Sequence, residues 1–134
     1  MRRGSHRSAI AGAPGEGMKL AQVAVERRGD TTVVRIEGEV DLSNADAVRS
    51  EIIAAAPHGS GGIVLDLTAT TYLDSSGIRL LFDVAERLHS RRQRIALVVT
   101  EAALVRRMLV LTKLDDAVPL HDDLDGALAA IALR

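Results

Sequence analysis

The sequence predicts a single α/β domain, in which a mixed β-sheet of four to five strands is covered by about four α-helices. The main observation is that short segments patterned like strands alternate along the chain with segments of helical periodicity. The chain also has 134 residues, of which 47% are hydrophobic, which is enough for one domain with a real core. Since it contains one Phe, one Tyr and no Trp, that core must be built mainly from Ile, Leu, Val and Ala.

The first predicted elements form a β-hairpin. Residues 22–27 alternate apolar and polar side chains, and the pattern resumes in residues 32–37. The intervening Arg28-Gly29-Asp30 is typical of a turn.

The later elements alternate in type. Residues 63–67 form a nearly continuous apolar run, which is typical of a strand buried on both faces. After a loop at 68–73 and a helix starting at 76, further strands are expected at 95–99 and at 118–120, where Pro119 favours a sheet edge. The other helices are expected from about 43 to 56, at 101–111 and at 124–133. The predicted N-cap of the first helix is Ser43 or Asn44, and that of the last helix is Asp122, Asp123 or Asp125. The apolar stripe of the first helix comprises Ala45, Val48, Ile52 and Ala55. The stripe of the second helix comprises Ile78, Leu81, Phe82, Ala85 and Leu88.

Composition and termini narrow the class of protein. Residues 1–17 show no periodicity and predict a flexible N-terminal tail before a domain at 18–134. The formal net charge of −1 provides no global field for nucleic acid or a membrane surface. The absence of cysteine excludes disulfides and thiolate metal sites, and no metal or cofactor is expected. No apolar run approaches the roughly 20 residues that span a bilayer, so a cytoplasmic protein is expected.

The segment Asp74-Ser75-Ser76-Gly77 places polar groups at the start of a predicted helix. Backbone N–H groups there lack partners within the helix, and the helix dipole adds partial positive charge. Asp74 is expected to cap these donors, and a phosphate on Ser75 would be tolerated at that end. The four residues on their own are also explained by capping alone, and this reasoning does not separate Ser75 from Ser76.

Three longer segments, in the right order, carry a resemblance to a known family. Residues 63–81, which include Asp74-Ser75-Ser76-Gly77, resemble the central signature of the STAS domain in its branch of bacterial anti-sigma factor antagonists. Residues 38–43 resemble that family's Gly-Glu-hydrophobic-Asp segment, and residues 109–115, 118–120 and 124–128 resemble its C-terminal part. The resemblance covers about residues 20–133, and one departure is Lys113, which stands where the family often has Gly after a helix.

What the resemblance implies is a partner switch and no enzymatic activity. The unmodified protein binds an anti-sigma factor, which is also a serine kinase that holds ATP and magnesium, and the sigma factor of a stress response or sporulation is released. The kinase phosphorylates the serine matching Ser75, and the phosphorylated antagonist dissociates from the kinase. A serine phosphatase then removes the phosphate. Asp41 matches an aspartate beside the phosphorylation site. The predicted partner surface comprises Asp41, Leu42, Ser43, Asp74, Ser75, Ser76, Gly77 and Arg79.

Other classes fit the sequence less well. A receiver domain with Asp66 as phospho-acceptor lacks a convincing acidic pair, because Glu37 and Glu39 are poorly placed and Lys113 follows a helix. A serine hydrolase is disfavoured because the Gly-x-Ser-x-Gly elbow is absent. His58, His89 and His121 are expected to be exposed, and His121 with Asp122, Asp123 and Asp125 has no recognisable metal-site spacing. Within the STAS class, the alternative is a non-switching interaction module, such as a subunit of a lipid transport complex.

Overall fold

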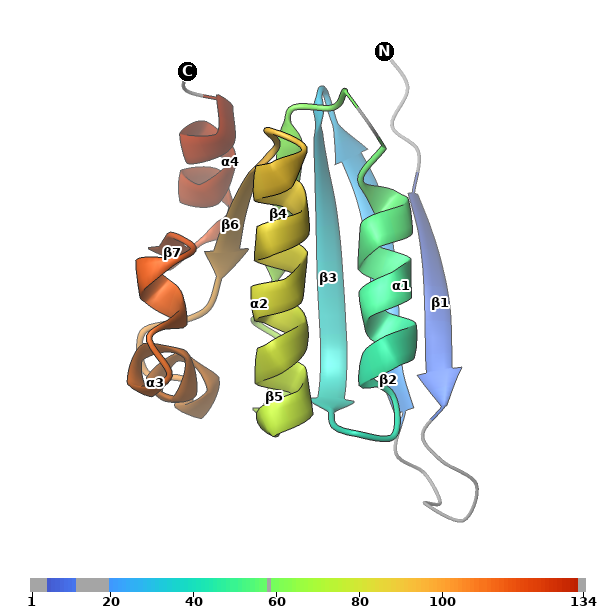
Figure 1. Cartoon of the computed structure of the whole chain (residues 1–134), viewed down its shortest axis with the longest axis vertical. Coiled ribbons are helices and arrows are strands. Elements are labelled where there is room, and N and C mark those ends of the chain that lie inside the picture. Colours follow the sequence, from blue (N-terminus) through green and yellow to red (C-terminus); the bar gives the residue numbers. More distant parts are fainter. Residues whose placement is uncertain (1–4, 12–19, 58, 133–134) are drawn as a thin grey trace.

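The protein is an α/β domain built on one mixed sheet (Figure 1). A computed structural model of the chain describes residues 5–11, 20–57 and 59–132. In that part of the chain the strands are β1 (Ser5–Ala11), β2 (Leu20–Arg28), β3 (Thr31–Val40), β4 (Gly62–Asp66), β5 (Thr70–Leu73), β6 (Arg94–Val98) and β7 (Leu120–His121). The helices are α1 (Ala45–Ala55), α2 (Ser75–Ser90), α3 (Leu104–Leu111) and α4 (Leu124–Ala132), with a 3-10 turn at Leu114–Asp116. The predicted fold class is confirmed.

The sheet combines an antiparallel edge with a parallel centre. The strand order is β1-β2-β3-β4-β6-β7, and β5 pairs with the end of β3. β1, β2 and β3 are antiparallel neighbours, whereas the other pairs are parallel. The predicted hairpin of β2 and β3 is confirmed, and Arg28 pairs with Thr31 across its turn. Gly29 there has φ +63°, which glycine adopts at little cost as the first residue of a two-residue hairpin turn.

Two strands lie where the sequence predicted none. Ser5–Ala11, expected within the flexible tail at 1–17, forms β1 along the edge of β2. Thr70–Leu73, expected within the loop at 68–73, forms β5. Both strands rest on backbone pairing, which side-chain periodicity does not reveal, and β5 pairs with a strand that is distant in sequence.

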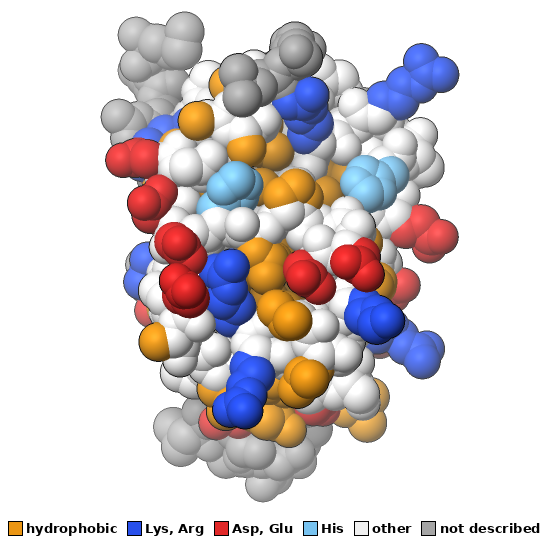
Figure 2. Space-filling view, turned by 90° about the vertical axis from the view of Figure 1, so that its left-hand side faces the viewer, with side chains coloured by type: hydrophobic (Ala, Val, Ile, Leu, Met, Phe, Trp, Pro, Cys, Tyr) orange, Lys and Arg blue, Asp and Glu red, His pale blue; other side chains and the backbone are white. Residues whose placement is uncertain are grey.

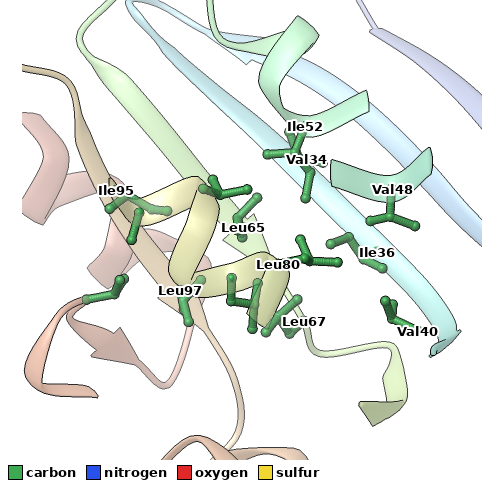
Figure 3. Close-up of a cluster of buried hydrophobic side chains, with 14 of the residues drawn as sticks. Val34, Ile36, Val40, Val48, Ile52, Leu65, Leu67, Leu80, Ile95 and Leu97 are labelled. Atoms are coloured by element: carbon green, nitrogen blue, oxygen red, sulfur yellow. The ribbon is translucent and has the colours of Figure 1, made fainter. Parts of the chain in front are cut away.

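The hydrophobic core lies on both faces of the sheet. Helices α1 and α2 cover one face, and the cluster beneath them includes Val34, Ile36, Val48, Ile52 and Leu65 (Figure 3). Helix α4 covers the other face with a smaller cluster, formed by Val33, Val64, Ala96, Val98, Ala127 and Ile131. All five residues of β4 are buried, which confirms the prediction of a strand enclosed on both faces.

The helical stripes were predicted with one error. On α1, Ala45, Val48 and Ile52 are buried as expected. On α2 the buried stripe includes Leu80 and Val84, whereas the predicted Phe82 is 37% exposed. Helix α2 packs against both α1 and β6. The buried face of the helix is therefore centred away from position 82.

The side of the molecule formed by α3, α4 and β7 carries charges of both signs (Figure 2). Acidic and basic side chains surround a narrow strip of hydrophobic side chains on this face. Interspersed charges do not provide the single-sign basic surface that nucleic-acid binding requires. No helix in the described ranges is both long enough and apolar enough to cross a membrane.

Lys113 adopts the left-handed conformation that its position after α3 suggested. Its φ is +65° and ψ +24°, and its N–H donates to the carbonyl of Val110 over 3.0 Å. Replacing Lys113 by Gly is expected to raise the free energy of unfolding by about 0.5–1 kcal/mol, because glycine adopts this conformation without the Cβ penalty. Urea denaturation checks this expectation. Arg92→Gly is a matched comparison, since Arg92 has φ +58°, and a loss of stability in Lys113→Gly would contradict the account.

Candidate functional site

Two segments that are far apart in the sequence meet at one end of the sheet. Strands β3 and β5 are parallel neighbours, and Val40 pairs with Leu73 in their last register position. The next residue of each strand, Asp41 or Asp74, therefore leaves the sheet at the same edge. The backbone N–H of Asp74 donates to the carbonyl of Val40 over 3.2 Å, which holds the two segments together.

Asp74 joins these segments through both of its carboxylate oxygens. Oδ1 accepts hydrogen bonds from the N–H groups of Ser76 (2.8 Å) and Gly77 (3.0 Å), so Asp74 is the N-cap of α2 as predicted. Oδ2 accepts from the N–H of Leu42 over 3.1 Å. One side chain therefore fixes the start of α2 and the loop after β3 relative to each other.

The loop between β3 and α1 is held by its own polar side chains. Asp41 accepts hydrogen bonds from the N–H of Ser43 (2.9 Å) and from its hydroxyl. The side chain of Asn44 accepts from the N–H of Asp41 and donates to the carbonyl of Glu39, each over 3.0 Å. Asn44 occupies the N-cap position of α1, but its side chain does not cap the helix, because it is engaged in fixing the loop.

Gly77 lies where the first turn of α2 packs closely against the ends of β3 and β5. A Cβ atom at this position would be 3.0 Å from the carbonyl oxygen of Val40 and 3.0 Å from a methyl carbon of Leu73. Since a backbone oxygen cannot move aside cheaply, a larger residue would push α2 away from β3. Glycine therefore favours the close packing that positions Ser75 and Ser76.

A surface hollow lies beside the start of α2. It is lined by Leu42, Ala45, Asp46, Arg49, Ser75, Ser76 and Arg79, and we refer to it as the Ser75 hollow. Leu42 is 81% exposed, the largest exposed fraction among the large hydrophobic side chains that the structure describes. Seven of the eight residues of the predicted partner surface, all but Gly77, are exposed or half-buried at this end of the molecule.

The two serines differ in their surroundings. Ser75, the first residue of α2, is exposed, whereas Ser76 is half-buried. Since Asp74 caps the helix, the hydroxyl of Ser75 is not needed for that purpose and forms no hydrogen bond with any residue that the structure describes. Ser75 is therefore the more accessible of the two serines, a difference that the sequence pattern alone did not reveal.

Arg49 is a residue of this site that the sequence reasoning missed. Its guanidinium contacts Asp46 on the same helix over 2.7 Å and Asp83 on α2 over 3.3 Å. The contact with Asp46 has the i,i+3 spacing of a helical ion pair and could have been found from the sequence. The contact with Asp83 depends on how α1 and α2 pack, which the sequence pattern does not define.

The structure does not form the alternative sites considered above, a receiver-type phospho-acceptor at Asp66 and a metal site near His121. Asp66 is 7% exposed and accepts hydrogen bonds from the N–H and hydroxyl of Thr68, so it stabilises a turn. Asp122 pairs with Arg106 over 3.0 Å, and Asp123 accepts from the N–H of Gly126 at the start of α4. Within residues 5–11, 20–57 and 59–132, no three His, Asp or Glu side chains are grouped as a metal site would need. His58 lies outside the described residues.

Comparison with known proteins identifies the family. The model of the STAS domain matches residues 22–127. The chain therefore belongs to the STAS domain family, as the resemblance implied. The same fold is found in distant members of the family. One is the Bacillus cell fate determinant SpoIIAA in its phosphorylated form, whose structure matches with a TM-score of 0.61 at 21% identity. The match covers 81% of this chain and 98% of the SpoIIAA chain.

More similar relatives indicate the branch of the family. Anti-sigma-F factor antagonist RsfB of Mycobacterium tuberculosis is 29% identical over 110 residues, which are 81% of this chain and 88% of that protein. The crystal structure of an anti-sigma factor antagonist from Mycobacterium paratuberculosis has a TM-score of 0.75 at 31% identity and covers 90% of this chain and 98% of that one. The predicted resemblance to the anti-sigma factor antagonists is confirmed. These relatives are regulatory binding proteins, in agreement with the prediction that the chain is not an enzyme.

Proposed function

We propose that this protein is an anti-sigma factor antagonist that is switched off by phosphorylation of Ser75. In the unmodified state it binds an anti-sigma factor, and the sigma factor is released. The partner is also a serine kinase that supplies ATP and magnesium, and a serine phosphatase restores the active antagonist. The setting is the bacterial cytoplasm, in the control of transcription during a stress response or sporulation.

The observation that carries this proposal is the exposed Ser75 hydroxyl beside a helix cap that does not use it. Asp74 satisfies the N–H groups of Ser76 and Gly77, so modification of Ser75 removes no hydrogen bond that stabilises the fold. A phosphate adds a charge of about −1.5 to −2 and a tetrahedral group. The helix dipole makes this end tolerant of an anion, and α2 stays folded. The change is confined to the surface that a partner contacts.

The rest of the surface fits a binding site for a protein. Leu42 presents an exposed apolar side chain within a rim of charged and hydroxyl groups, an arrangement that is common at the centre of protein interfaces. Leu42 and Ser75 are linked through Asp74, so both are displayed on a preorganised surface. Preorganisation reduces the ordering cost of association.

Mapping of the phosphate tests this proposal directly. The protein is incubated with its anti-sigma factor partner, with ATP and magnesium, and the modified residue is located by mass spectrometry. We expect one phosphate, on Ser75, and none on the Ser75→Ala variant, which should still bind the kinase. Ser76→Ala is the matched control and should be phosphorylated. Phosphate on Ser76 would refute the assignment, and binding without any phosphorylation would favour a non-switching STAS module.

A further inference from the structure

We propose that Arg79 captures the phosphate on Ser75, so that modification withdraws a cation from the partner surface as well as adding an anion. This inference rests on the proposed phosphorylation of Ser75. It concerns how the chain itself responds to the phosphate. Arg79 and Ser75 both line the Ser75 hollow, and Arg79 is exposed.

The helix places Arg79 over the position of the phosphate. Arg79 follows Ser75 by four residues, within the continuous helix α2. Residues with this spacing are neighbours on a helix surface, and the Cα–Cβ bond tilts toward the N-terminus, so a long side chain covers the preceding turn. An anion that precedes a cation by four residues is the more favourable of the two orders.

Arg79 is also available for this contact. The other guanidinium of the Ser75 hollow, that of Arg49, is engaged by Asp46 and Asp83 at 2.7 and 3.3 Å. In contrast, Arg79 forms no ion pair with any residue that the structure describes. A phosphate on Ser75 would therefore find one uncommitted guanidinium in the hollow, and guanidinium groups bind phosphate oxygens in a bidentate manner.

The carboxylates next to Ser75 make a contact between the phosphate and a cation more favourable. Asp74 directly precedes Ser75, and Asp46 lines the same hollow. Both oxygens of the Asp74 carboxylate are already engaged, since they accept hydrogen bonds from the N–H groups of Leu42, Ser76 and Gly77. Asp46 is paired with Arg49, so the repulsion of a dianion on Ser75 comes mainly from Asp74, and Arg79 offsets that repulsion.

The consequence is a switch with two components. Before modification, Arg79 is free to attract an acidic group of the partner. After modification, its charge is neutralised within the chain, and the same region presents a net negative charge. A partner surface that is complementary to the first state is repelled by the second.

Titration of the phosphate by ³¹P NMR tests this inference without any kinase. Phosphoserine is incorporated at position 75 of the full chain by genetic encoding, in the wild-type background and with Arg79→Gln, Arg79→Lys or Arg87→Gln. A nearby cation favours the dianion, so we expect the second phosphate pKa to be about 0.3–0.7 unit lower with Arg79 than with Gln. Lysine should retain part of this difference, since it keeps the charge but lacks the bidentate geometry.

Arg87→Gln is the matched control, because Arg87 is exposed on the same helix but follows Ser75 by twelve residues, about 18 Å along the axis. It should leave the phosphate pKa unchanged, and about 1 M salt should reduce the Arg79 effect. Equal phosphate pKa values in the wild-type background and in Arg79→Gln would overturn the proposed capture, as would a rise in Arg87→Gln as large as that in Arg79→Gln. Neither outcome touches the proposed function, which fails separately if the kinase leaves Ser75 unmodified.

Discussion

Replacing Ser75 by Asp is expected to weaken binding of the anti-sigma partner at least about tenfold, equivalent to about 1.4 kcal/mol. The introduced carboxylate lies in the Ser75 hollow next to Asp74, where it adds a negative charge to the surface that the partner meets. The fold should not change, because an acidic residue is favourable in the first turn of a helix. Isothermal titration calorimetry with the purified partner measures the affinity.

Ser50→Asp is the matched control for the added charge. Ser50 is exposed on α1 and does not line the Ser75 hollow, so this variant should bind within about twofold of wild type. Raising the salt concentration should narrow the gap between Ser75→Asp and wild type, since exposed charges are screened. An affinity of Ser75→Asp equal to that of wild type would exclude an electrostatic mechanism for release.

Replacing Asp74 by Ala is expected to lower the free energy of unfolding by about 2 kcal/mol. The variant loses the cap of α2, which is worth about 0.5–2 kcal/mol, together with the hydrogen bond from Leu42. In a domain of this size, the melting temperature should fall by about 6–10 °C. Differential scanning calorimetry measures this shift.

Asp74→Asn separates the two roles of the carboxylate. An amide has a single oxygen, so it can accept either from Ser76 and Gly77 or from Leu42, but not from both sides. We therefore expect a loss of about 1 kcal/mol, roughly half that of alanine. Asp123→Ala, which removes one capping bond to Gly126 on α4, provides a second comparison and should also cost about 1 kcal/mol. A melting temperature of Asp74→Ala equal to that of wild type would show that Asp74 does not stabilise this end of the helix.

The sequence predicted the elements whose side chains carry a clear pattern. The hairpin of β2 and β3 and the buried strand β4 were readable because burial imposes alternation or a continuous apolar run. Strand β5 was missed because the pairing of Val40 with Leu73 joins backbones from distant parts of the chain. Phe82 was misplaced because packing against two neighbours, and not periodicity alone, centres the buried arc of α2.

The sequence predicted which residues lie at the site, but it did not predict the hydrogen bonds and ion pairs that join them across the fold. Asp74 as a cap follows from local helix chemistry, and the structure confirms it. The hydrogen bond from Leu42 to Asp74 spans 32 positions, and the contact between Arg49 and Asp83 spans 34. Contacts of this kind depend on how β3, β5 and the two helices pack, so a linear pattern contains no signal for them. The accessibility of Ser75 relative to Ser76 likewise depends on that packing.

Tyr72 gives the protein an optical property of practical use. The chain contains one tyrosine and no tryptophan, so its intrinsic ultraviolet emission comes from a single residue. Tyr72 is 43% exposed and lies on β5, three positions before Ser75. A new negative charge or a docking protein close to that ring should alter its quantum yield. A charge introduced at position 75 can therefore be followed through the tyrosine emission of the unlabelled protein.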